Sequence, residues 1–225
     1  VHILKDIVHP PANLTQLALF KSLHYTNALG PDLTVELPRT HIWESGADVT
    51  KAGQTFVANM PTEECFISPM KGKAEGIVYS SKPLSYQGQL IDNGFHFVVK
   101  DGKIVEAHAE KGEDVLRSAI SLDEGACYFG EVALVPYDSP INNTGILFYN
   151  TLFDENASCH VALGRGFCDT IDGFEEKSLE ECQAMGVNDS MIHVDFMIGT
   201  KDLEIVAECK NGKNVTIMKN GKFTI

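Results

Sequence analysis

The sequence has no long hydrophobic run and few basic residues. No apolar stretch approaches the roughly 18 to 20 residues that a membrane-spanning helix needs, so we expect a soluble protein without membrane contact. Only 18 Lys and Arg stand against 31 Asp and Glu, which gives a net charge of −13. Nucleic-acid binding demands a positive surface, so this balance argues against a nucleic-acid partner. The acidic excess either serves solubility or includes carboxylates that bind metal cations.

The six cysteines form no recognisable pattern. They are scattered without a C-x-x-C pair, which argues against a cysteine zinc site and a disulfide framework. Reduced thiols are typical of the cytoplasm. The chain begins at Val1 without a charged leader followed by an apolar segment, so no signal peptide is predicted. We therefore expect a cytoplasmic protein, of which this chain is a fragment or a trimmed form.

Three segments have the patterns of helices. Apolar residues at helical spacing predict helices over residues 10–30 and 112–122. Ser178 and Glu181 have the spacing of a capping box, in which each side chain bonds the other residue's backbone N–H at the start of a helix. We expect that third helix to end at Gly186, because glycine tolerates the backbone conformation that terminates helices.

Much of the remaining sequence reads as antiparallel strands. Short apolar runs alternate with turn signals between residues 75 and 110, which predicts a meander. The pairs Asp101-Gly102, Asn211-Gly212 and Asn220-Gly221 each favour a tight hairpin turn. No repeat or linker interrupts the chain, so we expect a single domain over residues 1–225. Its predicted class is α+β, with antiparallel strands and hairpins.

Two apolar segments lead to or contain carboxylates. Residues 55–64 run from a strand pattern through a proline turn to Glu63 and Glu64. Adjacent side chains diverge, so at most one of the two is expected in a shared site; a solvated acidic turn is the alternative. Glu131 stands at the head of the apolar run 130–136. A buried carboxylate is costly unless it is paired or binds a cation; otherwise Glu131 lies just outside the strand, in water.

A third acidic segment adds a histidine. Residues 146–149 read as an apolar strand, and Glu155 and His160 follow it. Five residues correspond to about 140° on a helix, so one helical face cannot present both. A short helix capped by Asp154 or Asn156 would leave Glu155 in the loop before it and His160 in its first turns, where the two could converge. The alternative is a helix cap followed by a surface histidine.

Residues 191–199 have the pattern of a strand with a polar pair inside it. Side chains alternate along a strand, so His193 and Asp195 share one face roughly 6.6 to 7 Å apart, while the apolar residues between and around them take the other. This spacing suits two ligands on one or two metal ions. A single histidine on a strand is more often structural, but His-x-Asp among apolar residues is harder to explain that way.

Carboxylates and imidazoles together suit zinc, cobalt or manganese better than calcium, which prefers oxygen ligands. Six ligands are too many for one catalytic zinc ion and suit a pair. Ions roughly 3.5 to 4 Å apart occur in aminopeptidases, phosphatases and nucleases. The candidates are Glu63 or Glu64, Glu131, Glu155, His160, His193 and Asp195.

Four motifs in this order resemble the M29 family of metallo-aminopeptidases, which includes the bacterial aminopeptidases T and S. They are residues 56–64, 130–136, 147–164 and 192–199. The resemblance extends over nearly the whole chain. It implies that the chain is the catalytic, carboxy-terminal half of a family member, and that the family's amino-terminal domain is absent from it.

The resemblance also implies roles for single residues. Glu64 is the expected ligand of the Glu63–Glu64 pair, and Glu63 stays a secondary candidate. Glu131 is expected to bridge the two ions. The remaining ligand positions match Glu155, His160, His193 and Asp195.

One position departs from the family pattern. Seven residues after the ligand histidine, the family has a tyrosine thought to assist at the reacting carbonyl, and this chain has Phe167. The hydroxyl is therefore missing at Phe167, a position expected to be catalytic. Glu64 and Glu131 are the other two residues expected to be catalytic.

The activity implied is removal of residues from peptides with a free amino terminus, by water activated between two divalent ions. The resemblance suggests a homodimer. One alternative is a metal-binding, catalytically weak domain with a role in assembly or regulation, because of Phe167 or the absent half. A two-metal phosphoesterase is disfavoured, since neither a phosphate-binding glycine-rich loop nor a basic cluster is evident along the sequence.

Overall fold

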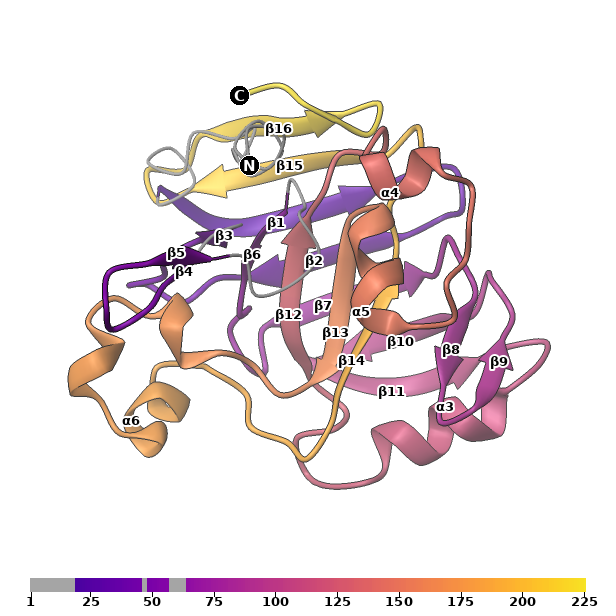
Figure 1. Ribbon diagram of the computed structural model, residues 1–225, viewed down its shortest axis with the longest axis horizontal. Helices are drawn as coiled ribbons and strands as arrows, with labels where there is room; N and C mark the ends of the chain where they lie inside the picture. The colour runs from indigo at the N-terminus through magenta and orange to yellow at the C-terminus, as the bar shows by residue number, and fades with distance from the viewer. Residues whose placement is uncertain (1–18, 46–47, 57–63) are drawn as a thin grey trace.

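Two antiparallel sheets make up most of the protein. The computed structural model describes residues 19–45, 48–56 and 64–225 of the chain. Within these residues strands predominate and helices are few and short, as Figure 1 shows. The predicted α+β class with antiparallel strands is confirmed.

The larger sheet has eight strands in the order β11-β10-β7-β2-β1-β15-β16-β17. All of its pairings are antiparallel, and the predicted hairpin turns join β10 to β11, β15 to β16 and β16 to β17. Its strands are β1 (Phe20–Thr26), β2 (Asp32–Glu36), β7 (Ala74–Tyr79), β10 (His96–Lys100), β11 (Lys103–His108), β15 (Glu204–Cys209), β16 (Asn214–Lys219) and β17 (Lys222–Phe223).

The smaller sheet has five strands in the order β14-β13-β12-β6-β3. Every residue of its two central strands, β12 and β13, is buried. Two-stranded ribbons pair β4 with β5 and β8 with β9. The bounds are β3 (Glu44–Ser45), β4 (Asp48–Val49), β5 (Thr55–Phe56), β6 (Cys65–Ile67), β8 (Leu84–Tyr86), β9 (Gln89–Ile91), β12 (Phe129–Leu134), β13 (His160–Gly164) and β14 (His193–Met197).

Aromatic side chains join the two sheets into one core. Phe97 of β10 and Phe196 of β14 have ring centroids 5.3 Å apart, and Phe95 packs against both. Val194 belongs to the same core. One face of β14 is therefore committed to packing, which leaves its other face for polar side chains.

Most helices lie at the margins of the sheets, but the short helix at Thr151–Asp154 lies in front of the smaller sheet (Figure 1). The predictions at residues 112–122 and after Ser178 are confirmed, the second with both hydrogen bonds of its capping box. No described helix is long and apolar enough to cross a membrane. The α-helices are α3 (Glu113–Ile120), α4 (Pro140–Asn143), α5 (Thr151–Asp154) and α6 (Leu179–Ala184), and the 3-10 helices are η1 (Glu155–Ala157), η2 (Cys168–Thr170) and η3 (Phe174–Glu176).

The helix predicted over residues 10–30 is wrong where the structure describes it. Residues 10–18 lie outside the described residues, and Phe20–Thr26 is the strand β1. This strand is central in its sheet, between β2 and β15, so backbone pairing on both sides outweighs a helical spacing of apolar residues.

The strand predicted at residues 146–149 is also wrong. The segment is a loop that follows α4, and Ile146 and Tyr149 are 59% and 61% exposed. Tyr149 has a φ of 58°, which is incompatible with an extended strand. Apolar composition suggested a buried strand, but this loop leaves Ile146 and Tyr149 exposed and Leu147 and Phe148 half-buried.

Candidate metal centre

Three neighbouring strands bring four of the candidate ligands to one face of the smaller sheet. Glu131 on β12 pairs with Ala162 on β13, which pairs with Asp195 on β14. Directly paired residues project to the same side of a sheet, as do residues two apart on a strand. His160 and His193 therefore share that side. Ala162 lies between the two carboxylates, and its single methyl group leaves room above the sheet.

Glu131 faces both histidines. Its Oε1 is 3.3 Å from Nε2 of His160, and its Oε2 is 3.5 Å from Nε2 of His193. Nε2 of His160 is also 3.0 Å from Oε1 of Glu64, and Nε2 of His193 is 3.3 Å from Oδ2 of Asp195. Two groups that could each hold an ion result, Glu64–Glu131–His160 and Glu131–His193–Asp195, with Glu131 in both. We call them the inner and the outer half of the cluster.

Backbone carbonyls orient both imidazoles. Nδ1 of His160 lies 3.2 Å from the carbonyl oxygen of Ser158, and Nδ1 of His193 lies 2.7 Å from that of Arg165. A carbonyl can only accept, so each Nδ1 carries a proton and donates it. In the neutral imidazole this leaves the lone pair on Nε2, directed at the carboxylates. Metal-binding histidines are typically held in this way.

Burial and mutual charge displace the proton affinities of the cluster. Burial raises the pKa of Glu131 to about 7, in spite of the hydrogen bond from His160. Burial alone would lower the pKa of both histidines, but the facing carboxylates raise that of His193 to about 9 and that of His160 well above its ordinary value. Without a cation, the cluster therefore retains protons near neutral pH. A divalent cation can replace them.

Asp195 has an acceptor atom that suits a cation. Burial would raise its pKa, yet hydrogen bonds from His193 and Glu155 and the nearby histidine charges hold it below the ordinary value. Its Oδ1 is buried and has no hydrogen-bond donor among the described residues. Several carboxylates that converge with an acceptor atom unpaired fit a bound cation.

Glu155 reaches this site from a different local structure than the sequence suggested. A helix beginning at Asp154 or Asn156 with His160 in its first turns is wrong. The helix α5 lies before Glu155 and is capped by Asn150, whose side chain accepts from the backbone of Leu152. Glu155 starts the buried turn η1, and His160 opens the strand β13.

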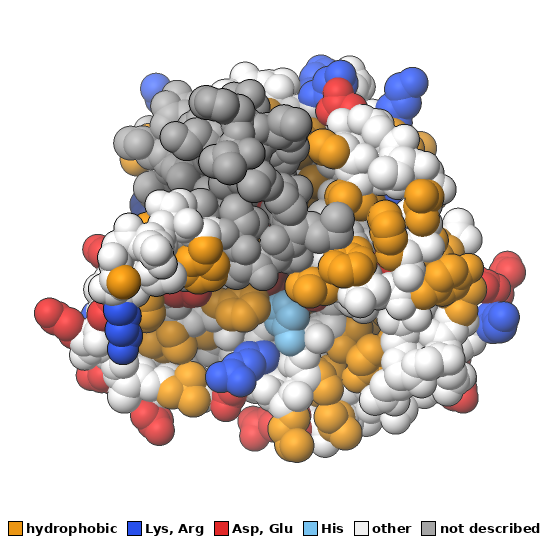
Figure 2. All heavy atoms as spheres, viewed as in Figure 1, with side chains coloured by type: hydrophobic (Ala, Val, Ile, Leu, Met, Phe, Trp, Pro, Cys, Tyr) orange, Lys and Arg blue, Asp and Glu red, His pale blue; other side chains and the backbone are white. Residues whose placement is uncertain are grey.

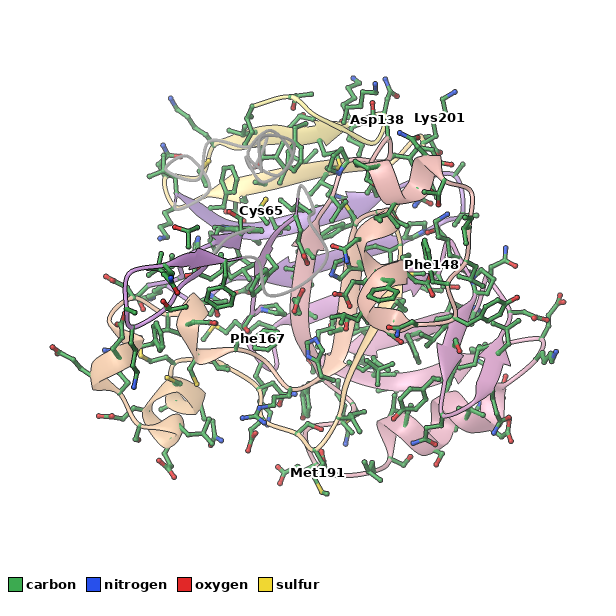
Figure 3. All side chains as sticks on the ribbon, viewed as in Figure 1. Cys65, Asp138, Phe148, Phe167, Met191 and Lys201 are labelled. Carbon is green, nitrogen blue, oxygen red and sulfur yellow. The ribbon has the colours of Figure 1, made fainter. Side chains whose placement is uncertain are left out.

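Phe167 lies against the outer half of the cluster. Its ring centroid is 4.9 Å from that of His193 and 5.7 Å from that of Phe66. Its backbone N–H donates to Oγ of Ser68 at 2.7 Å, which fixes the start of η2. Figure 3 labels Phe167 near the strands that carry the cluster. Glu63, the secondary candidate, lies outside the described residues.

Two residues that hold the strands of the cluster in place were not predicted from the sequence. Cys159, next to His160, donates through Sγ to the carbonyl of Val135 at 3.3 Å and accepts from its N–H at 3.4 Å, which ties β13 to the end of β12. Asp123 accepts from Ser190 Oγ at 2.9 Å and from the N–H of Met191 at 2.6 Å, just before β14. The Asp-x-Gly turn at residues 123–125 was a usable signal for Asp123; nothing local marked Cys159.

Comparisons with known proteins identify the family of this chain. A family model described as thermophilic metalloprotease (M29) matches residues 11–223. Aminopeptidase AmpS from Bacillus subtilis (strain 168) is 50% identical over 204 residues, which cover 91% of this chain and 49% of that protein. Aminopeptidase T from Thermus aquaticus is 41% identical over 219 residues, 97% of this chain and 53% of that protein.

A solved structure supports the same assignment. Wild-type AmpT from Thermus thermophilus superimposes with a TM-score of 0.87 at 39% identity, over 94% of this chain and 52% of that chain. The chain thus spans about half the length of the relatives it matches. The match over residues 11–223 and these identities establish that the chain belongs to the M29 family of thermophilic metalloproteases.

Proposed function

We propose that this chain is the catalytic half of an aminopeptidase that removes amino-terminal residues from peptides with two divalent metal ions. The observation that carries the proposal is the position of Glu131, whose two carboxylate oxygens face two different histidines at 3.3 and 3.5 Å. A carboxylate in this position can bridge a pair of ions. The aminopeptidase relatives and the family match support the reaction class.

The inner half of the cluster would hold one ion through Glu64, Glu131 and His160. The outer half would hold the other through Glu131, His193 and Asp195, with Glu155 completing the set beside Asp195. This mixture of oxygen and nitrogen ligands favours zinc, cobalt or manganese. When bound, such ions supply the Lewis acidity that lowers the pKa of water and polarises a peptide carbonyl.

The chain's own residues contribute orientation and proton transfer. The carbonyls of Ser158 and Arg165 hold Nε2 of each histidine toward the site. The burial of Glu64 and Glu131 excludes water and strengthens every charge interaction there. A carboxylate of the cluster, Glu64 or Glu131, would accept the proton of the attacking water.

The outer half is the side from which a peptide would arrive. The His193 side chain is 26% exposed, whereas that of His160 is 1% exposed. Figure 2 shows a histidine side chain at the surface in the middle of the drawn face, beside hydrophobic side chains. A homodimer, suggested by the family resemblance, and a cytoplasmic location, suggested by the scattered cysteines, complete the proposal.

The test is turnover of an aminoacyl chromogenic substrate by the complete protein. Removal of metal ions should abolish turnover. Addition of zinc, cobalt or manganese should restore turnover in the control variant Glu110→Gln, which changes an exposed glutamate. The same addition should not restore turnover in Glu131→Gln. Equal activity of Glu131→Gln and Glu110→Gln would refute the proposal.

A second candidate function rests on one observation, that Phe167 places no hydroxyl beside His193. A domain that binds two ions but is catalytically weak would have a role in assembly or regulation. The same assay separates the two functions, since that domain would bind both ions without cleaving any aminoacyl substrate.

A further inference from the structure

A cleft lined by basic side chains lies apart from the metal cluster. It has a volume of about 880 Å³, and no candidate metal ligand lines it. Its walls come from β1, the segments that follow β2, β6 and β15, and the end of α6. These segments are far apart in the sequence, so only the folded chain creates the cleft.

The charge of the cleft is opposite to that of the protein. Four of its ten lining residues are basic, Lys21, Arg39, Lys73 and Lys210, and one, Glu36, is acidic. The whole chain carries a net charge of −13. No basic cluster is visible along the sequence because each of these residues comes from a different segment. Like charges in a concave site create a local positive potential that attracts anions.

Among the described residues, Lys21, Arg39 and Lys73 are not neutralised by strong ion pairs. Nζ of Lys21 lies 3.3 Å from a Glu208 oxygen, with both side chains about half exposed, so the pair contributes little. Among the residues that the structure describes, no carboxylate pairs with Arg39 or Lys73. Nζ of Lys210 donates to the carbonyl of Arg39 at 3.0 Å, which holds its ammonium group beside Arg39.

The floor of the cleft is apolar. Leu37 is 4% exposed, and Met70 and Met185 line the same space half-buried. Methionine side chains adapt to the shape of a ligand. Basic groups above an apolar floor suit a molecule that carries anionic groups on a carbon skeleton.

We propose that this cleft binds a small organic anion with two or more carboxylate or phosphate groups. The planar guanidinium of Arg39 would take two oxygens of one anionic group, and Lys73 would take another. Leu37, Met70 and Met185 would contact the carbon part. This site is separate from the metal cluster and does not depend on the proposed peptidase activity.

The experiment is calorimetric titration of the complete protein after its metal ions have been removed, so that the probes cannot bind at the metal cluster. The probes are inorganic pyrophosphate and tricarballylate, which separate phosphate from carboxylate chemistry. R39Q/K73Q removes two charges from the cleft. The matched control, K103Q/K201Q, removes two charges from exposed lysines elsewhere.

The wild-type protein and K103Q/K201Q should bind at least one probe with the same affinity, and R39Q/K73Q should bind it at least about tenfold more weakly. The tighter probe identifies the anionic group. Equal weakening in both double variants would show that only net charge matters and would overturn the proposal. Failure of the wild-type protein to bind either probe would overturn it as well.

Discussion

The two halves of the candidate metal cluster contain similar side chains in different surroundings. In the inner half the side chains of Glu64, Glu131 and His160 are 10%, 6% and 1% exposed. In the outer half His193 is 26% exposed, and the ring of Phe167 lies against it. Both histidines are oriented by a backbone carbonyl, so the halves differ in access to water rather than in geometry.

The difference in exposure suggests that ions in the two halves would have different roles. Charges attract more strongly where water is excluded, so an ion in the inner half should bind tightly and exchange slowly. His193 makes the outer half the more exposed one, so its ion should exchange faster and meet the substrate. Glu131 belongs to both halves and couples them.

The largest effect is expected from Glu131→Gln, because it removes the shared carboxylate. The neutral amide binds divalent cations poorly, so at least one ion should be lost and turnover should disappear. Metal content by mass spectrometry and calorimetric stoichiometry measure the loss, with Glu110→Gln as the control. An unchanged stoichiometry would show that Glu131 does not bridge.

Phe167→Tyr would sharpen the comparison by changing only the outer half. A hydroxyl beside His193 could donate a hydrogen bond to the oxyanion that forms during peptide cleavage. The loss of one such donor costs roughly 10²- to 10³-fold, so its restoration in the complete protein should raise kcat by up to this factor. Metal stoichiometry should not change, because Phe167 offers no ligand atom.

Phe66→Tyr is a suitable control for Phe167→Tyr, since it adds the same hydroxyl to the neighbouring ring. An equal gain in both variants would argue against a specific role for position 167. No gain from Phe167→Tyr in a protein that already cleaves aminoacyl substrates well would place the donor elsewhere.

The two halves can be separated by single substitutions. Glu64→Gln should weaken only the tight binding phase, and Asp195→Asn only the weak one. Each effect should be at least about 100-fold, because even residues that only orient a ligand contribute up to this factor. Competition with a metal-binding dye resolves the two phases. If both variants weakened the same phase, the assignment of the halves would be wrong.

The sequence predicted which side chains converge better than it predicted the local structure that presents them. His193 and Asp195 share a face because strand alternation is local, and this prediction is confirmed. The local structure between Glu155 and His160 could not be predicted. The short helices α5 and η1 are followed closely by the strand β13, and elements this short leave no periodic signal in the sequence. Phe20–Thr26 was mistaken for a helix because its pairing partners lie on β2 and, far along the chain, on β15.

Asp123→Asn tests whether the outer half depends on the loop before β14. Asp123 accepts from Ser190 and Met191 of that loop, and the amide has less capacity to accept. The weak binding phase should lose about tenfold in affinity, and the tight phase should be unaffected. The control is Asp202→Asn. Asp202 also accepts hydrogen bonds, but it lies in the turn before β15 of the larger sheet. Equal losses in both phases would indicate a general loss of stability.

The smallest effect concerns the stability of the metal-free protein as a function of pH. Folding raises the pKa of His193 from 6.5 to about 9 and that of Glu131 from 4.5 to about 7. A group with a raised pKa binds its proton more tightly in the folded state, so its stabilising contribution is complete below the unfolded pKa and is lost as pH rises through the folded one. The Tm of metal-free protein should therefore fall by a few degrees between about pH 5 and pH 9.

Bound metal ions should remove this fall of Tm with rising pH. They compete with the protons on His160, His193 and Glu131, so metal affinity should rise over the same pH range and the metal-bound protein should keep its Tm. Parallel thermal scans of metal-free and zinc-loaded protein provide the measurement. His193→Gln, which removes the titrating group of the outer half alone, should flatten the metal-free profile between about pH 7 and pH 9. If the dependence of Tm on pH were unchanged in that variant, the titration would belong to the inner half. There burial lowers the pKa of His160, but the facing Glu64 raises it.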